Sequence, residues 1–231
     1  MLIGCPVYNR GWILHRWFKA AQVLEPDGFV FAYTPSDDDT LEILQHWQKR
    51  ADVTILVYDE GTHGTTREWN NRERIETLAT ARNLILDRVA DTGQDYMSLD
   101  SDIILMGDSF ILHLTEWDAV SPTVSLATDR TIINAFTHRR PDGWTVRAQP
   151  GWHGSVDVLC AAILMRAELV QDSGVRYSYH ARGEDFAWSA AARQFDYSLG
   201  LCTDRAKHYM TRGRKAIVPP NPIEGHHIVR R

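Results

Sequence analysis

Short apolar segments alternate with amphipathic segments through the first hundred residues of the chain. The strand-like apolar segments lie at residues 2–8, 29–33, 53–57 and 96–99. Apolar residues recur with helical spacing at residues 12–24, 40–48 and 68–89. Strands that alternate with helices are typical of a parallel sheet with helical crossovers. We therefore predict a parallel α/β sheet here, with ligands bound beyond the carboxyl ends of its strands.

The alternation changes after residue 105. Strand-like segments follow at residues 119–127, 131–137, 158–166 and 197–202, and helical segments at residues 110–116, 167–171 and 184–193. Consecutive strands without helices between them predict an antiparallel or mixed portion. From Lys207 onward the chain is basic, then rich in proline and histidine. This last segment is predicted to lie over the surface or to close on a ligand. The expected fold is one α/β domain, a mixed sheet flanked by helices, with halves 1–105 and 106–231.

Composition indicates an ordinary globular protein. The chain has 231 residues, of which 44% are hydrophobic and 24% charged, and this length favours one domain. No apolar run approaches the roughly 20 residues that span a bilayer, and a strand-like segment opens the chain, so we expect a cytoplasmic protein without a secretory leader. Cys5, Cys160 and Cys202 are widely spaced in apolar sequence, which predicts buried thiols rather than a zinc site.

Charge is distributed unevenly about a net value of −5. Residues 1–129 hold 10 Lys and Arg against 21 Asp and Glu, whereas residues 130–231 hold 15 against 9. This asymmetry indicates that the two halves face different partners. The alternative is a surface of uneven charge without a functional meaning.

Two carboxylates interrupt the apolar sequence around residue 100. Asp100 and Asp102 stand between the strand-like residues 96–99 and the apolar residues 103–105. Charge at the end of a buried strand is costly unless it is paired or binds a cation. On an extended chain, side chains two positions apart point to the same side, so both could bind one Mg²⁺ or Mn²⁺. The alternative is a turn with two solvated aspartates.

Five short motifs in order resemble the GT-A glycosyltransferases. They are Cys5-Pro6-Val7-Tyr8-Asn9-Arg10, Ser36-Asp37-Asp38-Asp39-Thr40, Ala81-Arg82-Asn83, Asp100-Ser101-Asp102 and Gly183-Glu184-Asp185-Phe186. Together they cover almost the whole chain. The arginine–asparagine helix and the Gly-Glu-Asp-Phe motif are most similar to the fungal Golgi mannosyltransferase group. The resemblance implies a GT-A (Rossmann-like) fold, with a nucleotide-sugar-binding half and an acceptor-binding half.

The resemblance also implies roles for individual residues. The donor-binding set is Pro6, Tyr8, Asn9, Arg10, Asp37, Asp38, Asp39, Arg82, Asp100 and Ser101. Asp102 is predicted to bind Mn²⁺ or Mg²⁺ directly, with Asp100 holding ribose or metal-bound water. His208 is the candidate third ligand, with His226 and His227 as competitors.

Some of these residues have ordinary structural explanations. Any of the aspartates at 37–39 could cap a helix, since carboxylates are favourable at a helix N-terminus. Arg82 could lie near the pyrophosphate, pair with Asp100 or be a surface arginine. Glu184 and Asp185 open a helix, where one could cap it. We favour Asp185, either as the base that accepts the acceptor's proton or as the group that orients the acceptor.

Aromatic side chains are further candidates for ligand contact. Trp144, Trp152 and His153 are candidate platforms, because aromatic faces stack on sugars and bases.

We favour the function of a metal-dependent glycosyltransferase that uses a UDP- or GDP-sugar. A nucleotidyltransferase would need a glycine-rich, basic loop that residues 5–11 lack. A catalytically silent glycan- or nucleic-acid-binding module gains little from clustered carboxylates.

The acceptor is predicted from charge. The basic second half favours a polyanionic acceptor. One concrete form is a hydroxymethylated pyrimidine in DNA. Some phage-encoded glycosyltransferases modify this base in the host cytoplasm. A glycan is the alternative. The basic residues are Arg139, Arg140, Arg147, Arg182, Arg193, Arg205, Lys207, Arg212, Arg214, Lys215, Arg230 and Arg231.

Overall fold

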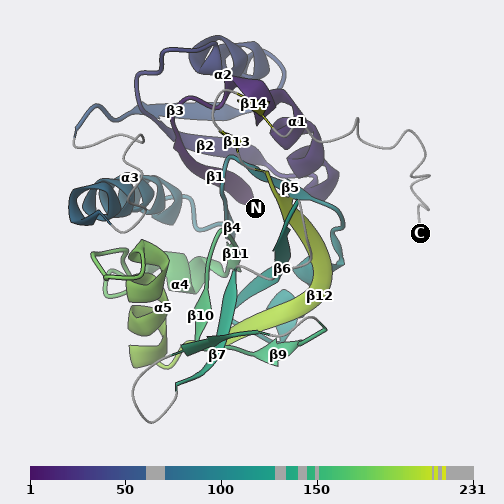
Figure 1. Cartoon of the computed structure of the whole chain (residues 1–231), viewed down its shortest axis with the longest axis vertical. Coiled ribbons are helices and arrows are strands. Elements are labelled where there is room, and N and C mark those ends of the chain that lie inside the picture. The colour runs from purple at the N-terminus through teal and green to yellow at the C-terminus, as the bar shows by residue number, and fades with distance from the viewer. Residues whose placement is uncertain are drawn as a thin grey trace.

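A single mixed sheet of nine strands runs through both halves of the chain (Figure 1). The structure is a computed structural model that describes residues 1–60, 71–127, 134–139, 145–148, 151–209, 211–212 and 215–216. The strand order is β3-β2-β1-β4-β11-β6-β12-β5, with β9 paired to β12. Strands β1 to β4 are parallel, and β11 enters antiparallel beside β4. The predicted mixed α/β fold is therefore confirmed.

The first half has the predicted elements. Its strands are β1 (Leu2–Val7), β2 (Gly28–Tyr33), β3 (Val53–Val57) and β4 (Tyr96–Leu99). Its helices are α1 (Gly11–Ala21), which continues into the 3-10 turn η1 (Gln22–Leu24), α2 (Thr40–Gln48) and α3 (Arg72–Ala90). The boundaries of α2 and β3 match the prediction. The start of the helical pattern at 68–70 lies outside the described residues.

The second half completes the large sheet around β11 and adds a small sheet. The remaining strands of the large sheet are β5 (Ile103–Leu105), β6 (Ala119–Leu126), β9 (Gly154–Ser155), β11 (Ala162–Met165) and β12 (Leu199–His208). A small sheet joins β7 (Ala135–Arg139), β8 (Thr145–Arg147) and β10 (Val158–Leu159), and β13 (Thr211–Arg212) pairs with β14 (Lys215–Ala216). The helical elements are η2 (Ser109–Thr115), α4 (Ala167–Gln171) and α5 (Glu184–Gln194). The segment predicted as a helix at 110–116 is thus a 3-10 helix.

Helices cover both faces of the large sheet (Figure 1). On one face, Trp17 and Phe18 of α1 pack with Phe31 and Trp47. On the other face, α3, α4 and α5 bury a second cluster around Trp188. Burial of these apolar side chains is the main force that holds the helices on the sheet.

The segment predicted as one strand at 158–166 is two strands. β10 pairs with β7 in the small sheet, and β11 pairs with β4 and β6 in the large one. Between them Ala161 has φ of 68°, a left-handed conformation that a strand cannot contain. The single-strand prediction is therefore wrong, because the apolar run serves two sheets.

The last long strand extends beyond its predicted end at 202. A bulge between Cys202 and Arg205 lets β12 continue to His208, still paired with β6. The second part of β12 also pairs with β5, where His208 is opposite Ile103. His208 is therefore the end of a strand, rather than part of a segment that follows one.

Among the described helices, none is both long and apolar enough to cross a lipid bilayer.

Candidate active site

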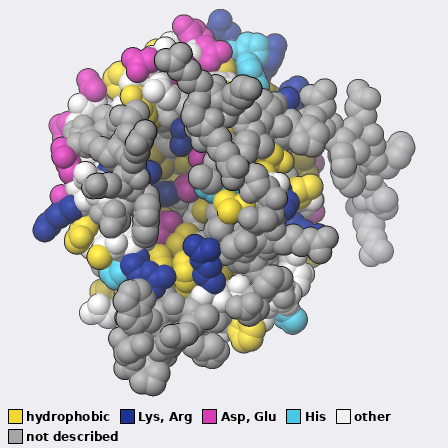
Figure 2. Space-filling view, in the orientation of Figure 1, with side chains coloured by type: hydrophobic (Ala, Val, Ile, Leu, Met, Phe, Trp, Pro, Cys, Tyr) yellow, Lys and Arg dark blue, Asp and Glu magenta, His cyan; other side chains and the backbone are white. Residues whose placement is uncertain are grey.

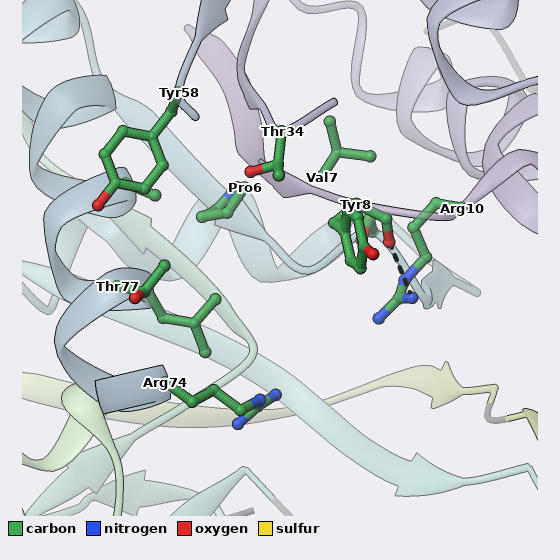
Figure 3. Close-up of a pocket in the computed structure, with 11 residues that line it drawn as sticks. Pro6, Val7, Tyr8, Arg10, Thr34, Tyr58, Arg74 and Thr77 are labelled. Carbon is green, nitrogen blue, oxygen red and sulfur yellow. Dashed lines mark hydrogen bonds between the residues drawn. The ribbon is translucent and has the colours of Figure 1, made fainter. Parts of the chain in front are cut away.

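The carboxyl ends of β1, β2, β3 and β4 meet at a crevice with two adjoining cavities. The smaller, of about 120 Å³, is lined by Pro6, Val7, Tyr8, Arg10, Thr34, Tyr58, Arg74, Thr77, Leu78, Ala81 and Ser101. Figure 3 shows Tyr58, Thr34 and Tyr8 along the strand ends and Thr77 and Arg74 approaching from α3. The larger, of about 420 Å³, shares Pro6, Arg10, Arg74, Leu78 and Ser101 with it.

The larger cavity concentrates charge. It is also lined by Arg82, Asp100, Asp102, Arg147, Arg182, Glu184, Asp185 and His208. Figure 2 shows acidic and basic side chains side by side in the hollow of this face. Most of the predicted site residues thus come together here, although they are far apart in the sequence.

Arg82 is buried at the centre of these charges, with its side chain only 7% exposed. It donates from Nη2 to Asp100 Oδ1 over 2.6 Å, from Nε to Glu184 Oε1 over 3.1 Å and from Nη1 to Ser98 Oγ over 2.9 Å. Burial by itself would lower the pKa of Arg82, but Asp100, Asp185 and Glu184 outweigh it and raise that pKa. Arg82 therefore links the turn after β4 to the start of α5. Of the three placements predicted for Arg82, the structure shows the pairing with Asp100.

Asp102 faces a different pair of basic side chains. Its Oδ1 lies 3.3 Å from His208 Nε2, and its Oδ2 accepts from Arg10 Nη2 over 3.3 Å. Burial opposes the charged form, but the hydrogen bond and charge of His208, together with Arg10, lower the pKa of Asp102. Burial likewise opposes protonation of His208, and Asp102 outweighs it and raises the pKa of His208.

The Asp-x-Asp segment is a turn. The N–H of Ile103 donates to the carbonyl of Asp100 over 2.9 Å, and the buried Trp17 Nε1 donates to the same oxygen over 3.0 Å. The prediction of an extended segment is therefore wrong, although both carboxylates line the larger cavity. The turn gives Asp100 and Asp102 different partners.

Glu184 and Asp185 are held at the first turn of α5. Gly183 precedes them with φ of 117°, a conformation that favours glycine. The N–H of Ala161 donates to Asp185 Oδ2 over 3.3 Å, while the carbonyl of Ala161 accepts from the N–H of Asp100 over 2.8 Å. The left-handed residue between β10 and β11 thus contacts both acidic segments.

Asp185 is poised to exchange a proton near neutrality. Burial, assisted by the charges of Glu184 and Asp100 and opposed by Arg82, raises the pKa of Asp185 to about 7. A carboxylate with such a pKa is suited to act as a general base.

The loops after β1 and β2 are bonded to each other. Asn9, with φ of 51°, accepts at Oδ1 from the N–H of Asp37 over 2.9 Å. The Asp38 carboxylate accepts from the N–H of Gly11 over 2.9 Å, and Asp39 stands at the N-terminus of α2. None of these three aspartates lines the two cavities. Asp38 thus links the two loops, whereas Asp39 makes no side-chain capping hydrogen bond to α2. A nucleotide contact by this segment stays a prediction.

Comparison with known structures identifies the fold. No protein-family model matches the sequence, and no curated protein matches it. S. aureus TarS aligns with a TM-score of 0.60 at 13% identity, over 90% of this chain and 36% of TarS. A TarS fragment in complex with UDP-GlcNAc aligns with a TM-score of 0.58 at 13% identity, over 91% of this chain and 59% of the fragment. The fold is GT-A-like.

Two further structures share this GT-A-like fold. A197 from STIV aligns over 98% of both chains, with a TM-score of 0.53 and 13% identity. A putative glucose-1-phosphate thymidylyltransferase from Bacillus anthracis aligns over 90% of this chain and 88% of its own, with a TM-score of 0.51 and 10% identity. The resemblance to fungal Golgi mannosyltransferases stays a prediction.

Sequence reasoning missed one wall of the GT-A-like crevice. Arg74, Thr77, Leu78 and Ala81 of α3 line the smaller cavity, just before Arg82 in the same helix. The signal was present, because residues at i, i+3, i+4 and i+7 share one helix face.

Several residues predicted to contact a ligand do not line the two cavities. Trp152 and His153 are exposed and line neither cavity. Trp144, His226 and His227 lie outside the described residues, as do the side chains of the basic residues at 139, 140, 212, 214, 215, 230 and 231. Arg193 pairs with Asp157 over 2.7 Å. Of the basic residues of the second half, Arg147 and Arg182 line the larger cavity.

The site can be tested for its fit to a divalent cation. Among the described residues, no three His, Cys, Asp or Glu side chains form a ready metal cluster. Asp102 Oδ1 and His208 Nε2, however, are 3.3 Å apart. Adjacent ligands of an octahedral ion bound at about 2.1 Å are roughly 3 Å apart, and Mg²⁺ sites use one or two carboxylates plus substrate phosphates. Asp102 and His208 therefore fit a metal that is completed by a diphosphate and water.

Proposed function

We propose that this protein is a metal-dependent glycosyltransferase that transfers a sugar from a nucleoside-diphosphate sugar to an acceptor hydroxyl. The observation that carries this proposal is the gathering of the Asp102–His208 pair and of Asp185 around one cavity in a GT-A-like fold. The TarS structures with UDP-GlcNAc and with UDP support the choice of donor.

The residues of the crevice divide the reaction between them. Asp102 and His208 would hold Mn²⁺ or Mg²⁺, which supplies charge stabilisation to the departing diphosphate. Arg10 lies beside Asp102 and lines both cavities, so its guanidinium can contact the same leaving group. Asp185 accepts the proton of the acceptor hydroxyl as its oxygen bonds to the anomeric carbon. The bond from that carbon to the diphosphate oxygen breaks, and its electron pair leaves with the diphosphate.

Three of the buried polar atoms that have no hydrogen-bond partner belong to this machinery. They are Arg10 Nε, Asp185 Oδ1 and His208 Nδ1. Seven buried side-chain atoms of the described residues lack a hydrogen-bond partner in all. Buried polar groups are normally satisfied, so their concentration at the crevice supports a polar ligand there.

The acceptor we propose is nucleic acid, with hydroxymethylated pyrimidine in DNA as its concrete form. The basic second half and the arginines of the larger cavity favour a polyanion. A glycan acceptor is the alternative within the same enzyme class.

The test is to incubate the protein with UDP- and GDP-sugars and Mn²⁺ and to measure the nucleotide released without acceptor. We expect slow release of nucleoside diphosphate that stops with a chelator and in Asp102→Asn. It should continue in the control Asp91→Asn, since Asp91 is an exposed aspartate that directly follows α3. No release with any donor would contradict the proposal and favour a silent binding module. Release of pyrophosphate from a nucleoside triphosphate and a sugar phosphate would identify a nucleotidyltransferase instead.

A further inference from the structure

Arg10 is a built-in cation beside the two candidate metal ligands. It stands directly before helix α1, and its Nη2 donates to Asp102 Oδ2 over 3.3 Å. The other oxygen of that carboxylate, Oδ1, lies 3.3 Å from His208 Nε2. An arginine keeps its charge at every pH at which a protein is folded. One of the two oxygens of Asp102 is therefore already engaged by a permanent positive charge.

Main-chain carbonyls hold this guanidinium in place. Its Nη1 donates to the carbonyl of Tyr8 over 3.2 Å and to the carbonyl of Asn9 over 3.3 Å. Figure 3 shows the bond between Arg10 and Tyr8. The backbone N–H of Arg10 donates to Thr40 Oγ1 over 2.8 Å, which ties the same residue to the start of α2. The loops after β1 and β2 thus fix the guanidinium at Nη1.

The opposite edge of the guanidinium has donors to spare. A guanidinium has five N–H donors, and the bonds to Tyr8, Asn9 and Asp102 use three of them. Its Nε is buried and has no hydrogen-bond partner among the described residues. Nε and Nη2 form the fork that suits two oxygens of one phosphate. Because Arg10 lines both cavities, a diphosphate that passes between them competes with Asp102 for this edge.

The balance of charge disfavours a metal ion that binds without a nucleotide. Asp100 is paired with Arg82 over 2.6 Å, so Asp102 is the Asp-x-Asp carboxylate left to the metal. A divalent ion on Asp102 places its double charge next to Arg10, with a single carboxylate between them. Like charges at such short range repel even at an effective dielectric constant of about 20. The phosphates of a nucleoside diphosphate supply the missing negative charge.

We propose that Arg10 couples the binding of metal to the binding of nucleotide. Arg10 bonds to Asp102 until a nucleoside diphosphate takes over its Nε–Nη2 edge, and this exchange frees Asp102 for the metal. The proposal rests on the proposed function for the identity of the two ligands. Metal alone meets an engaged carboxylate and an uncompensated cation. Linked equilibria are reciprocal, so the metal strengthens nucleotide binding by the same factor.

The experiment measures Mn²⁺ binding from the electron paramagnetic resonance signal of the free ion, with and without UDP or GDP. It is done at about pH 8, where imidazole is mostly neutral and able to bind metal. Without nucleotide, Arg10→Met should bind Mn²⁺ about tenfold more tightly than the wild type, since the repelling charge is gone. At saturating Mn²⁺, it should bind UDP or GDP about tenfold more weakly, since the fork is gone. These opposite changes are the signature of the coupling.

Three further variants separate charge, fork and fold. Arg10→Lys keeps the charge but loses the planar fork, so its Mn²⁺ affinity without nucleotide should match the wild type while its nucleotide binding is weaker. Arg10→Gln is a second neutral variant and should behave as Arg10→Met does. Lys19→Met is the matched control, because Lys19 is an exposed cation in the last turn of α1, and it should change neither affinity. Thermal unfolding of each variant establishes that the fold is retained.

The outcomes are distinguishable from failure of the proposed function. An Mn²⁺ affinity without nucleotide that is no higher in Arg10→Met and Arg10→Gln than in the wild type would overturn the coupling. So would an equal gain in Lys19→Met, or a wild type that binds Mn²⁺ equally well with and without nucleotide. Donor hydrolysis tests the transferase separately. Coupling without hydrolysis would leave Arg10 its role and remove the transferase, and hydrolysis without coupling would do the reverse. Absence of Mn²⁺ binding under both conditions would overturn the coupling and the metal dependence together.

Discussion

Replacement of Arg82 by methionine should destabilise the protein strongly. Methionine keeps much of the aliphatic volume of arginine but leaves Asp100 and Glu184 without their shared cation. The side chains of Arg82 and Glu184 are 7% and 9% exposed, and that of Asp100 is 30% exposed. Removal of one member of a buried ion-pair network costs about 3–5 kcal/mol, because the remaining charges stay buried and unpaired.

The loss can be measured by thermal and denaturant unfolding. For a chain of this length, each kcal/mol corresponds to about 2–4 °C, so the melting temperature should fall by roughly 6–20 °C. Arg72→Met is the matched control on the same helix. Arg72 pairs with Glu76 but is 71% exposed, and exposed pairs are worth about 1 kcal/mol or less.

The pH dependence gives a second check on the cause. Without Arg82, the pKa of Asp100 and that of Asp185 should rise further, since Arg82 lowers both. The carboxyls then become neutral on mild acidification, and the penalty disappears with their charge. The destabilisation should therefore be smaller at about pH 5 than at about pH 8. A loss no larger than that of Arg72→Met, or one independent of pH, would refute the reasoning.

Three further predictions concern single residues of the crevice. Asp102→Ala should abolish the Mn²⁺-dependent thermal stabilisation by UDP or GDP, and an undiminished shift would contradict its role as a ligand. Asp185→Asn should reduce transfer by about 10²-fold with donor binding retained. Because the pKa of Asp185 is raised to about 7, folding stability should fall as pH rises from about 4 to 7, and calorimetry of the variant should show a smaller fall. Ala161→Gly should be tolerated and Ala161→Val should destabilise, since φ of 68° suits glycine and strains a β-branched residue; equal unfolding curves would contradict this.

The order of elements could be predicted because each depends on local pattern. Continuously apolar runs indicated β1 to β4, because a strand covered by helices on both faces is buried along most of its length, and apolar residues with a period near 3.6 indicated the helices between them. The positions of Asp100 and Asp102 at a strand end followed from the same pattern. This information lies within segments of about ten residues.

The partners of the charged residues depend on the tertiary structure. Arg82 and Glu184 are 102 positions apart in the chain, and their bond exists because α3 and α5 cover the same face of the sheet. His208 reaches Asp102 only because a bulge lets β12 continue past its apolar part and pair with β5. Local periodicity carries no information about such a bulge.

The division of the apolar run around Ala161 is the clearest contrast. The sequence by itself indicated buried strand at residues 158–159 and 162–165, because the run from 158 to 165 is continuously apolar. Only the tertiary structure decided that they break at Ala161, where one end joins β7 and the other joins β4. The physical reason is that two sheets compete for the backbone hydrogen bonds of one segment, and a left-handed residue lets both be satisfied.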